Sequence, residues 1–200
     1  MTKVRRRRRG RSFTHVLIND VVAAQKRVRD ADSPTHRRDL VRSVFAAIEG
    51  LHWQLKQDVY RHSGHISQGM SIHEQAAMLE ETYSVDDSGK VRSVPRFLPL
   101  ASKIRLVVSI VQRYQTSYNL DYSHKGWSNL RTAIKLRDRL VHPKKLTDLN
   151  VTMAEVRQTV SAFYWFLALV IELLRETLEY RKELVARMKT AKAGQLVQDL

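Results

Sequence analysis

The chain has no cysteine, so neither disulfide bonds nor thiolate metal ligands can contribute to its fold or chemistry. Glycine and proline are also scarce, with seven and four among 200 residues. A fold rich in β-turns needs many of both, so their scarcity favours helices. The apolar share of 43% is close to the globular norm. A chain of this length can bury a sizeable core without covalent staples, and we expect a protein of a reducing compartment.

The sequence also lacks a long apolar run of the kind that crosses a membrane. Its most apolar segment, Val160 to Leu174, has 15 residues and contains Glu172. A bilayer span needs about 20 apolar residues, so this segment is typical of a buried core helix. The stretch after the N-terminal arginines contains His15, Asn19 and Asp20, which is too polar for a signal peptide. We therefore expect a cytoplasmic protein without a membrane partner.

Positive charge is concentrated at the N-terminus. The net charge is +15, of which +7 comes from the first eleven residues, where no acid occurs; the bases are Lys3, Arg5, Arg6, Arg7, Arg8, Arg9 and Arg11. Such a self-repelling segment predicts a disordered arm. It could contact nucleic-acid phosphates without recognising bases. Equally, it could be a solvated charge run, or it could meet the acidic stretch 74–87 of its own or another chain.

Helical periodicity dominates the remainder. Apolar spacing typical of a helix begins at Phe13. Ser33-Pro34 signals the start of a long helix, and further helices follow from Leu100 and across residues 127–141. Thr152 with Glu155 forms a capping box before the last long helix. The sequence thus predicts an all-α, up-and-down bundle of five or six helices in one domain, residues 12–188, with a C-terminal tail at residues 189–200.

One segment, residues 64–95, interrupts this pattern. Ser71 and Glu74 predict a capped short helix. Two β-prone stretches flank the turn residues 86–90, which predicts a small hairpin. We interpret the whole segment as an insertion between two helices of the bundle.

The segment that combines an arginine, an acid and a histidine is Arg137-Asp138-Arg139-Leu140-Val141-His142, followed by Pro143. The proline ends the helix near His142 and frees that residue from helical geometry. A guanidinium suits a phosphate, and an imidazole transfers protons near neutral pH, so the pair has the groups that metal-free RNA cleavage requires. Alternatively, His142 caps the helix and Arg137 is an ordinary surface charge. Arg137 appears on an apolar stripe between Ile134 and Val141, where a charge is costly unless it is paired or lines a cleft.

This segment closely resembles the signature of the HEPN superfamily, an arginine, a polar residue, three variable residues and a histidine at the end of the third helix of a four-helix core. The resemblance implies that the helices from Pro34, Leu100, Trp127 and Met153 form that core. It also implies a metal-independent endoribonuclease, often a toxin or a phage-defence effector with a protein antitoxin, in which two motifs face each other in a homodimer. Arg137 would stabilise the phosphate, His142 would act as acid and base, and Asp138 would orient its neighbours. Glu49 is a looser candidate from the first core helix.

Other features are less informative. Arg139, Lys144 and Lys145 beside the motif are candidate nucleic-acid contacts together with the arm. No cofactor and no metal are expected, since His62 and His65 have no third ligand nearby in the sequence. The series Tyr114, Tyr118 and Tyr122 could stack on bases, although packing explains such spacing more often. Residues 163–166 belong to the core or to a dimer contact.

The main functional alternative to the nuclease is a non-catalytic helical module that binds nucleic acid or a regulatory protein. No heptad pattern dictates a dimer, so the dimer rests on the resemblance.

Overall fold

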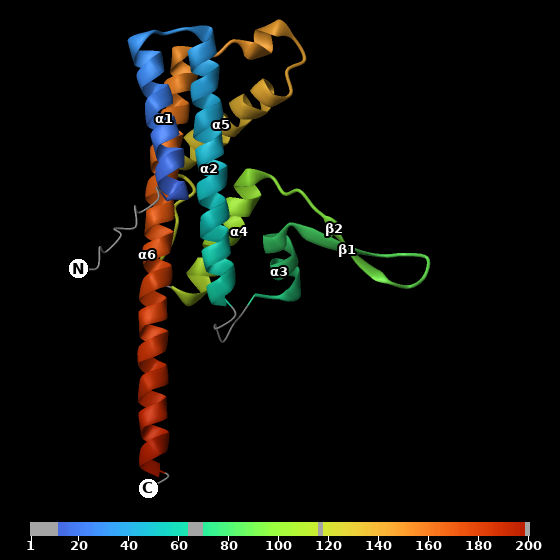
Figure 1. Cartoon of the computed structure of the whole chain (residues 1–200), viewed down its shortest axis with the longest axis vertical. Helices are drawn as coiled ribbons and strands as arrows, with labels where there is room; N and C mark the ends of the chain where they lie inside the picture. Colours follow the sequence, from blue (N-terminus) through green and yellow to red (C-terminus); the bar gives the residue numbers. More distant parts are fainter. Residues whose placement is uncertain (1–11, 64–69, 116–117, 199–200) are drawn as a thin grey trace, which may run out of the picture.

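The computed structural model describes residues 12–63, 70–115 and 118–198, and these form helices with one small hairpin (Figure 1). The elements are α1 (Phe13–Asp30), α2 (Pro34–Ser63), α3 (Ile72–Leu79), β1 (Glu81–Val85), β2 (Val91–Pro95), α4 (Leu100–Tyr114), α5 (Lys125–Val141), the 3-10 helix η1 (Leu146–Leu149) and α6 (Met153–Gln198). The predicted all-α class is confirmed. The arginine arm lies outside the described residues.

The helices begin where the sequence predicts. Ser33 accepts a hydrogen bond from the backbone N–H of His36 at the start of α2. Ser71 and Glu74 form the predicted capping box of α3. At α6, the Glu155 carboxylate accepts from the Thr152 N–H at 2.8 Å, and the Thr152 hydroxyl accepts from the Glu155 N–H. These bonds satisfy N–H groups that a helix leaves without partners.

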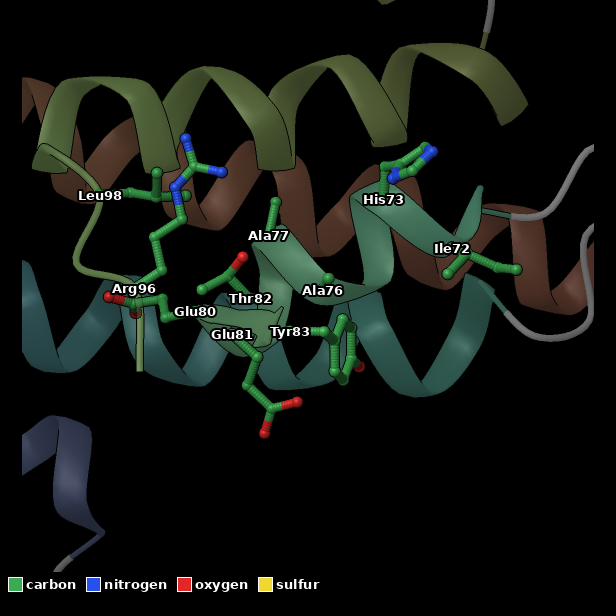
Figure 2. A pocket seen from close by; sticks show the side chains of 10 residues that line it. All are labelled: Ile72, His73, Ala76, Ala77, Glu80, Glu81, Thr82, Tyr83, Arg96 and Leu98. Atoms are coloured by element: carbon green, nitrogen blue, oxygen red, sulfur yellow. The ribbon is translucent and has the colours of Figure 1, made fainter. Parts of the chain in front are cut away.

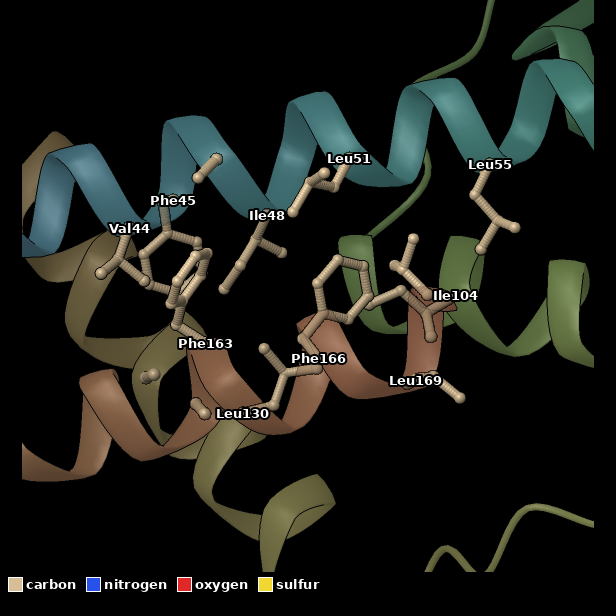
Figure 3. Close-up of a cluster of buried hydrophobic side chains, with 14 of the residues drawn as sticks. Val44, Phe45, Ile48, Leu51, Leu55, Ile104, Leu130, Phe163, Phe166 and Leu169 are labelled. Carbon is tan, nitrogen blue, oxygen red and sulfur yellow. The ribbon is translucent and has the colours of Figure 1, made fainter. Parts of the chain in front are cut away.

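The core lies between α2 and α6 and is completed by α4 and α5 (Figure 3). Phe163 and Phe166 of α6 are fully buried and meet Ile48 and Leu51 of α2. Leu130 enters from α5. The four helices that the resemblance assigns to a core thus surround one hydrophobic cluster, and α1 packs along the outside of α2.

The contact between α5 and α6 is unusually close at Gly126. A Cβ atom at this position would lie 2.1 Å from the indole ring of Trp165. The neighbouring Trp127 is buried. The Tyr122 ring packs edge-on against the Trp127 ring at 5.1 Å between centroids, and the Arg105 guanidinium lies 5.3 Å from the centre of the Trp127 ring. Only a residue without a side chain allows the two helices to approach this closely.

The tyrosines of the series 114, 118 and 122 are packing residues. The Tyr114 hydroxyl lies 3.0 Å from the Thr177 hydroxyl on α6, and Tyr118 is buried. Burial raises the pKa of Tyr114 to about 12. These rings tie α4 and the following loop to the bundle, so the packing interpretation holds for them.

The predicted hairpin is present, with Tyr83 opposite Ser93 and Gly89 at a positive φ of 78° in its turn. The hairpin projects sideways from the bundle (Figure 1). Carboxylates of the acidic stretch pair with bases of the helical body: Glu74 with Arg113, and Glu80 with Lys56 and Lys103.

Helix α6 continues well past the other helices (Figure 1). It ends at Gln198, so the tail expected at residues 189–200 is helical over most of its length. By length and composition alone, Met153–Thr190 could cross a membrane, which is weak evidence for a span, and 44% of its most apolar window is buried in the bundle.

Candidate functional site

Helix α5 ends where Pro143 requires it to end. Its last residue is Val141, and His142 is the C-cap, with its backbone N–H donated to the Asp138 carbonyl at 3.0 Å. The predicted helix end is confirmed. The His142 side chain is exposed.

Arg137 lies at the edge of the buried face of α5, where its side chain is 34% exposed and Ile134 packs partly buried against the core. It is paired and lines a cavity, the two conditions that the sequence interpretation set for a charge on this stripe. The buried residues of the last turns are Ala133, Leu136 and Leu140, whereas Val141 is 49% exposed. Two apolar stripes overlap on this helix, and α6 packs against the one that does not contain Arg137. Arg137 therefore lies beside the core.

The Arg137 guanidinium has two carboxylate partners. It donates to Glu49 of α2 at 2.7 Å and to its neighbour Asp138 at 3.2 Å. The arginine and Glu49 side chains keep 34% and 43% of their surface exposed. The structure thus brings together three of the four predicted catalytic residues, including Glu49, which lies 88 positions away in the sequence.

These three residues line a cavity of about 430 Å³ between α2, α4 and α5, which we call the charged cavity. Lys103 of α4 also lines it, so two cations and two carboxylates meet there. One wall is the strap between the hairpin and α4, and its Phe97 is 90% exposed. The full lining is Phe45, Glu49, Phe97, Leu98, Pro99, Leu100, Lys103, Ile134, Arg137 and Asp138.

Sequence reasoning missed Lys103 and Phe97. The only signal for Phe97 was its place between two prolines, Pro95 and Pro99, which hold the strap away from helix and sheet. Lys103 carries no local signal, because it reaches the cavity only through the packing of α4 on α2.

Lys103 links the charged cavity to a second ion-pair cluster. Its ammonium lies 3.2 Å from Glu80, which also accepts from Lys56 at 3.0 Å. Burial favours the neutral form of Glu80, but the two ammonium groups outweigh it and hold its pKa below the usual range. Glu80 itself has a left-handed backbone, with φ 58°, at the end of α3. A non-glycine residue in this conformation is held there by its surroundings. Here the Glu80 N–H donates to the carbonyls of Ala76 and Ala77, and the Glu80 carbonyl accepts from the Arg96 N–H at 2.7 Å.

His52 lies beside this cluster and is 3% exposed. Burial lowers its pKa to about 4, and the positive charges of Lys103 and Lys56 act in the same direction. The imidazole is therefore neutral at neutral pH. It is a residue of the interior and does not line the charged cavity.

The remaining predicted residues are arranged differently. His142, Lys144 and Lys145 are exposed and are not among the lining residues of the charged cavity. Arg139 donates to the Asn150 carbonyl, in the loop before α6, at 2.7 Å and pairs with Glu155 of α6 at 3.0 Å. These contacts give Arg139 a role in fixing the loop between α5 and α6.

A second, smaller cavity of about 230 Å³ lies between α3 and the hairpin (Figure 2). Its lining includes His73, Glu81, Tyr83 and Arg96, and none of the predicted catalytic residues. Leu98 lines both cavities, so the strap is a wall of each. Within the described ranges, no group of three histidine or acidic side chains could hold a metal ion.

Compared with protein-family models, with curated proteins and with solved structures, the chain matches none.

Proposed function

We propose that this protein is a cytoplasmic, metal-independent endoribonuclease of the HEPN type that binds RNA in the charged cavity. The observation that carries the proposal is the Arg137 guanidinium, held by Glu49 of another helix in an open cavity, five residues before His142 in the sequence. A half-exposed arginine on two carboxylates can exchange a carboxylate for a phosphate.

The cavity offers groups suited to a nucleotide. Arg137 presents a planar fork that fits two phosphate oxygens, and Lys103 adds a second positive charge. Phe97 exposes an aromatic face at the rim, on which an unpaired base can stack. Glu49 and Asp138 balance the two cations, which favours a backbone phosphate held loosely enough to be released.

His142 would supply proton transfer. A base removes the proton of a ribose 2′-hydroxyl, whose oxygen attacks the adjacent phosphorus while the 5′-oxygen leaves with a proton from an acid. The products are a 2′,3′-cyclic phosphate and a 5′-hydroxyl, and Arg137 stabilises the charge on the phosphorus centre. Because His142 lies outside the cavity of its own chain, the scissile phosphate would lie between cavity and helix end, or His142 of a second copy would act there, as the resemblance implies.

The test uses the purified full chain and single-stranded RNA with EDTA in excess. We expect cleavage that leaves 2′,3′-cyclic ends and that falls at least 100-fold in His142→Ala and in Arg137→Ala. His15→Ala, a change of an exposed histidine on α1, is the matched control and should cleave normally. Absence of cleavage by the wild type, or full activity of both site variants, would contradict the proposal.

A non-catalytic RNA-binding module is the second candidate. It is favoured by the position of His142 outside the cavity and by the pairing of Arg137 with two carboxylates. It predicts salt-dependent RNA binding that Arg137→Ala weakens and His142→Ala leaves unchanged, without cleavage by the wild type.

A further inference from the structure

Helix α6 carries an apolar stripe that its own bundle covers only in part, where the Tyr164 hydroxyl donates to Gln25 of α1 at 3.0 Å. Six large apolar side chains along it are each between 37% and 64% exposed: Tyr164, Ile171, Leu174, Leu178, Val185 and Met188. We call this set the outer stripe. Its last members, Val185 and Met188, lie beside the end of α2, and α6 continues past the other helices (Figure 1).

The spacing of the outer stripe is that of a coiled coil. Its members are separated by seven, three, four, seven and three residues, and the half-buried Leu167 and the exposed Arg181 fill the two gaps. When apolar residues follow one another at alternating steps of three and four, they all lie along one face of the helix, and this face can pair with a second helix in a coiled coil. The residues one position earlier, among them Phe163, Phe166, Val170 and Leu173, form a parallel line that is buried in the bundle. The bundle uses the inner line, so the outer one is free to pair.

The exposed area is sufficient for self-association. At roughly 150–200 Å² for a large apolar residue, the six exposed fractions amount to roughly 500 Å² on each chain. Two chains would bury roughly 1,000 Å² from these side chains alone, which is the lower limit of a specific interface. The aliphatic parts of Arg175 and Lys182, which flank the stripe, add to this area.

We propose that the outer stripe binds the outer stripe of a second copy of this chain, with the two α6 helices antiparallel. Arg181 decides the direction. In a parallel pair it would face its own counterpart, placing two positive charges in an apolar contact. In an antiparallel pair centred between Leu174 and Leu178, Arg181 faces Ile171 of the second copy, and each Leu174 meets a Leu178.

A groove on the molecule fits this antiparallel register. It has a volume of about 520 Å³, lies between the end of α2 and the facing part of α6, and is lined by Arg61, His62, Tyr180, Arg181, Leu184, Val185 and Met188. In the antiparallel register, Met188 and Val185 face Tyr164 and Leu167 of the second copy. An aromatic and an aliphatic side chain would therefore enter an apolar groove that one chain leaves open.

This pairing does not bring His142 of a second copy to the charged cavity, because in the antiparallel register Met153 of the second copy lies beyond Met188 of the first. The outer stripe also shares no residue with the charged cavity. The proposed contact lies on a repeat that the sequence analysis did not single out, because Arg181 interrupts it and a buried apolar line runs beside it. Loss of pairing and loss of cleavage are separate measurements on the same protein.

Oligomeric state tests the contact. Sedimentation equilibrium of the full chain at about 100 μM should give twice the 23.3 kDa of one chain. The double change Ile171→Glu with Leu178→Glu should give the single mass with an unchanged far-UV circular dichroism spectrum, because both positions are exposed in one chain. Ala186→Glu adds the same kind of charge on another side of α6 and should remain dimeric. A monomeric wild type, or a dimeric double variant, would overturn the proposal.

Direction is tested with introduced cysteines, which report cleanly because the chain has none. Mixed Val185→Cys and Leu167→Cys chains should form a disulfide with each other on oxidation. Val185→Cys alone should not, because antiparallel pairing separates its two copies by about 27 Å at 1.5 Å per helical residue. A Val185→Cys homodisulfide would contradict the antiparallel arrangement. Monomers that bind anionic vesicles through the same stripe would contradict pairing altogether and identify a membrane as the occupant.

Discussion

Replacing Glu49 by glutamine should tighten RNA binding, because Glu49 competes with phosphate for the Arg137 guanidinium. The substitution keeps the size of the side chain and a hydrogen-bond acceptor but removes the charge 2.7 Å from the arginine. It changes the formal charge of Lys103, Arg137, Glu49 and Asp138 together from zero to +1. Both partners are more than a third exposed, so solvent screens the pair and its contribution is about 0.5–1 kcal/mol. Release of that competition corresponds to a gain of about 2- to 5-fold in RNA affinity.

Fluorescence anisotropy of a labelled single-stranded RNA at fixed salt measures this change, in a His142→Ala background that prevents cleavage. Glu183→Gln on α6 is the control, since it removes one exposed carboxylate far along the chain and should alter affinity less than the site variant does. Arg137→Ala should weaken binding. Unchanged or weaker binding by Glu49→Gln would refute the idea that phosphate replaces this carboxylate on Arg137.

Three further changes test the account. In the same background, Phe97→Ala should weaken binding of single-stranded RNA by about 1–3 kcal/mol, the worth of one base stacked on an aromatic ring, whereas Phe97→Tyr should retain it. Gly126→Ala should lower the free energy of unfolding by about 1–3 kcal/mol in urea titrations, since the new methyl group meets the Trp165 ring; a more stable variant would show that this contact is relaxed. The His52 pKa of about 4 lies below its unfolded value of 6.5, so the unfolded chain binds the extra proton between these pH values. Protonation of His52 should therefore lower the free energy of unfolding by about 2–3 kcal/mol as the pH falls from 7 to 4.5. His52→Asn should not show this part of the pH dependence.

Local signals in the sequence were sufficient for the elements of the fold. Ser33-Pro34, Ser71 with Glu74, and Thr152 with Glu155 mark helix starts that the structure contains, since capping depends on neighbours along the chain. The hairpin followed in the same way from its turn residues.

The sequence could not show which of two overlapping apolar stripes on one helix is buried. On α5, periodicity could not distinguish the stripe through Arg137 from the one through Leu136 and Leu140, because both have helical spacing. On α6, two apolar lines one residue apart looked like a continuous apolar run, and Arg181 interrupted the outer one. Only the packing of the other helices shows which line remains exposed.

The candidate site was predictable in part for the same reason. The spacing of Arg137, Asp138 and His142 is local and was visible in the sequence. Lys103 and Phe97 reach the charged cavity through tertiary packing, and no local pattern marks them.

The central claim is that RNA is cleaved by attack of its own 2′-hydroxyl at Arg137 and His142, without a metal ion. The most direct measurement uses a single-stranded RNA with one 2′-deoxynucleotide on the 5′ side of a mapped cleavage position, incubated with the purified chain in excess EDTA. We predict that cleavage at that position disappears, that it persists at unmodified positions, and that it is lost everywhere in His142→Ala. Undiminished cleavage at the deoxy position, or in His142→Ala, would contradict the claim.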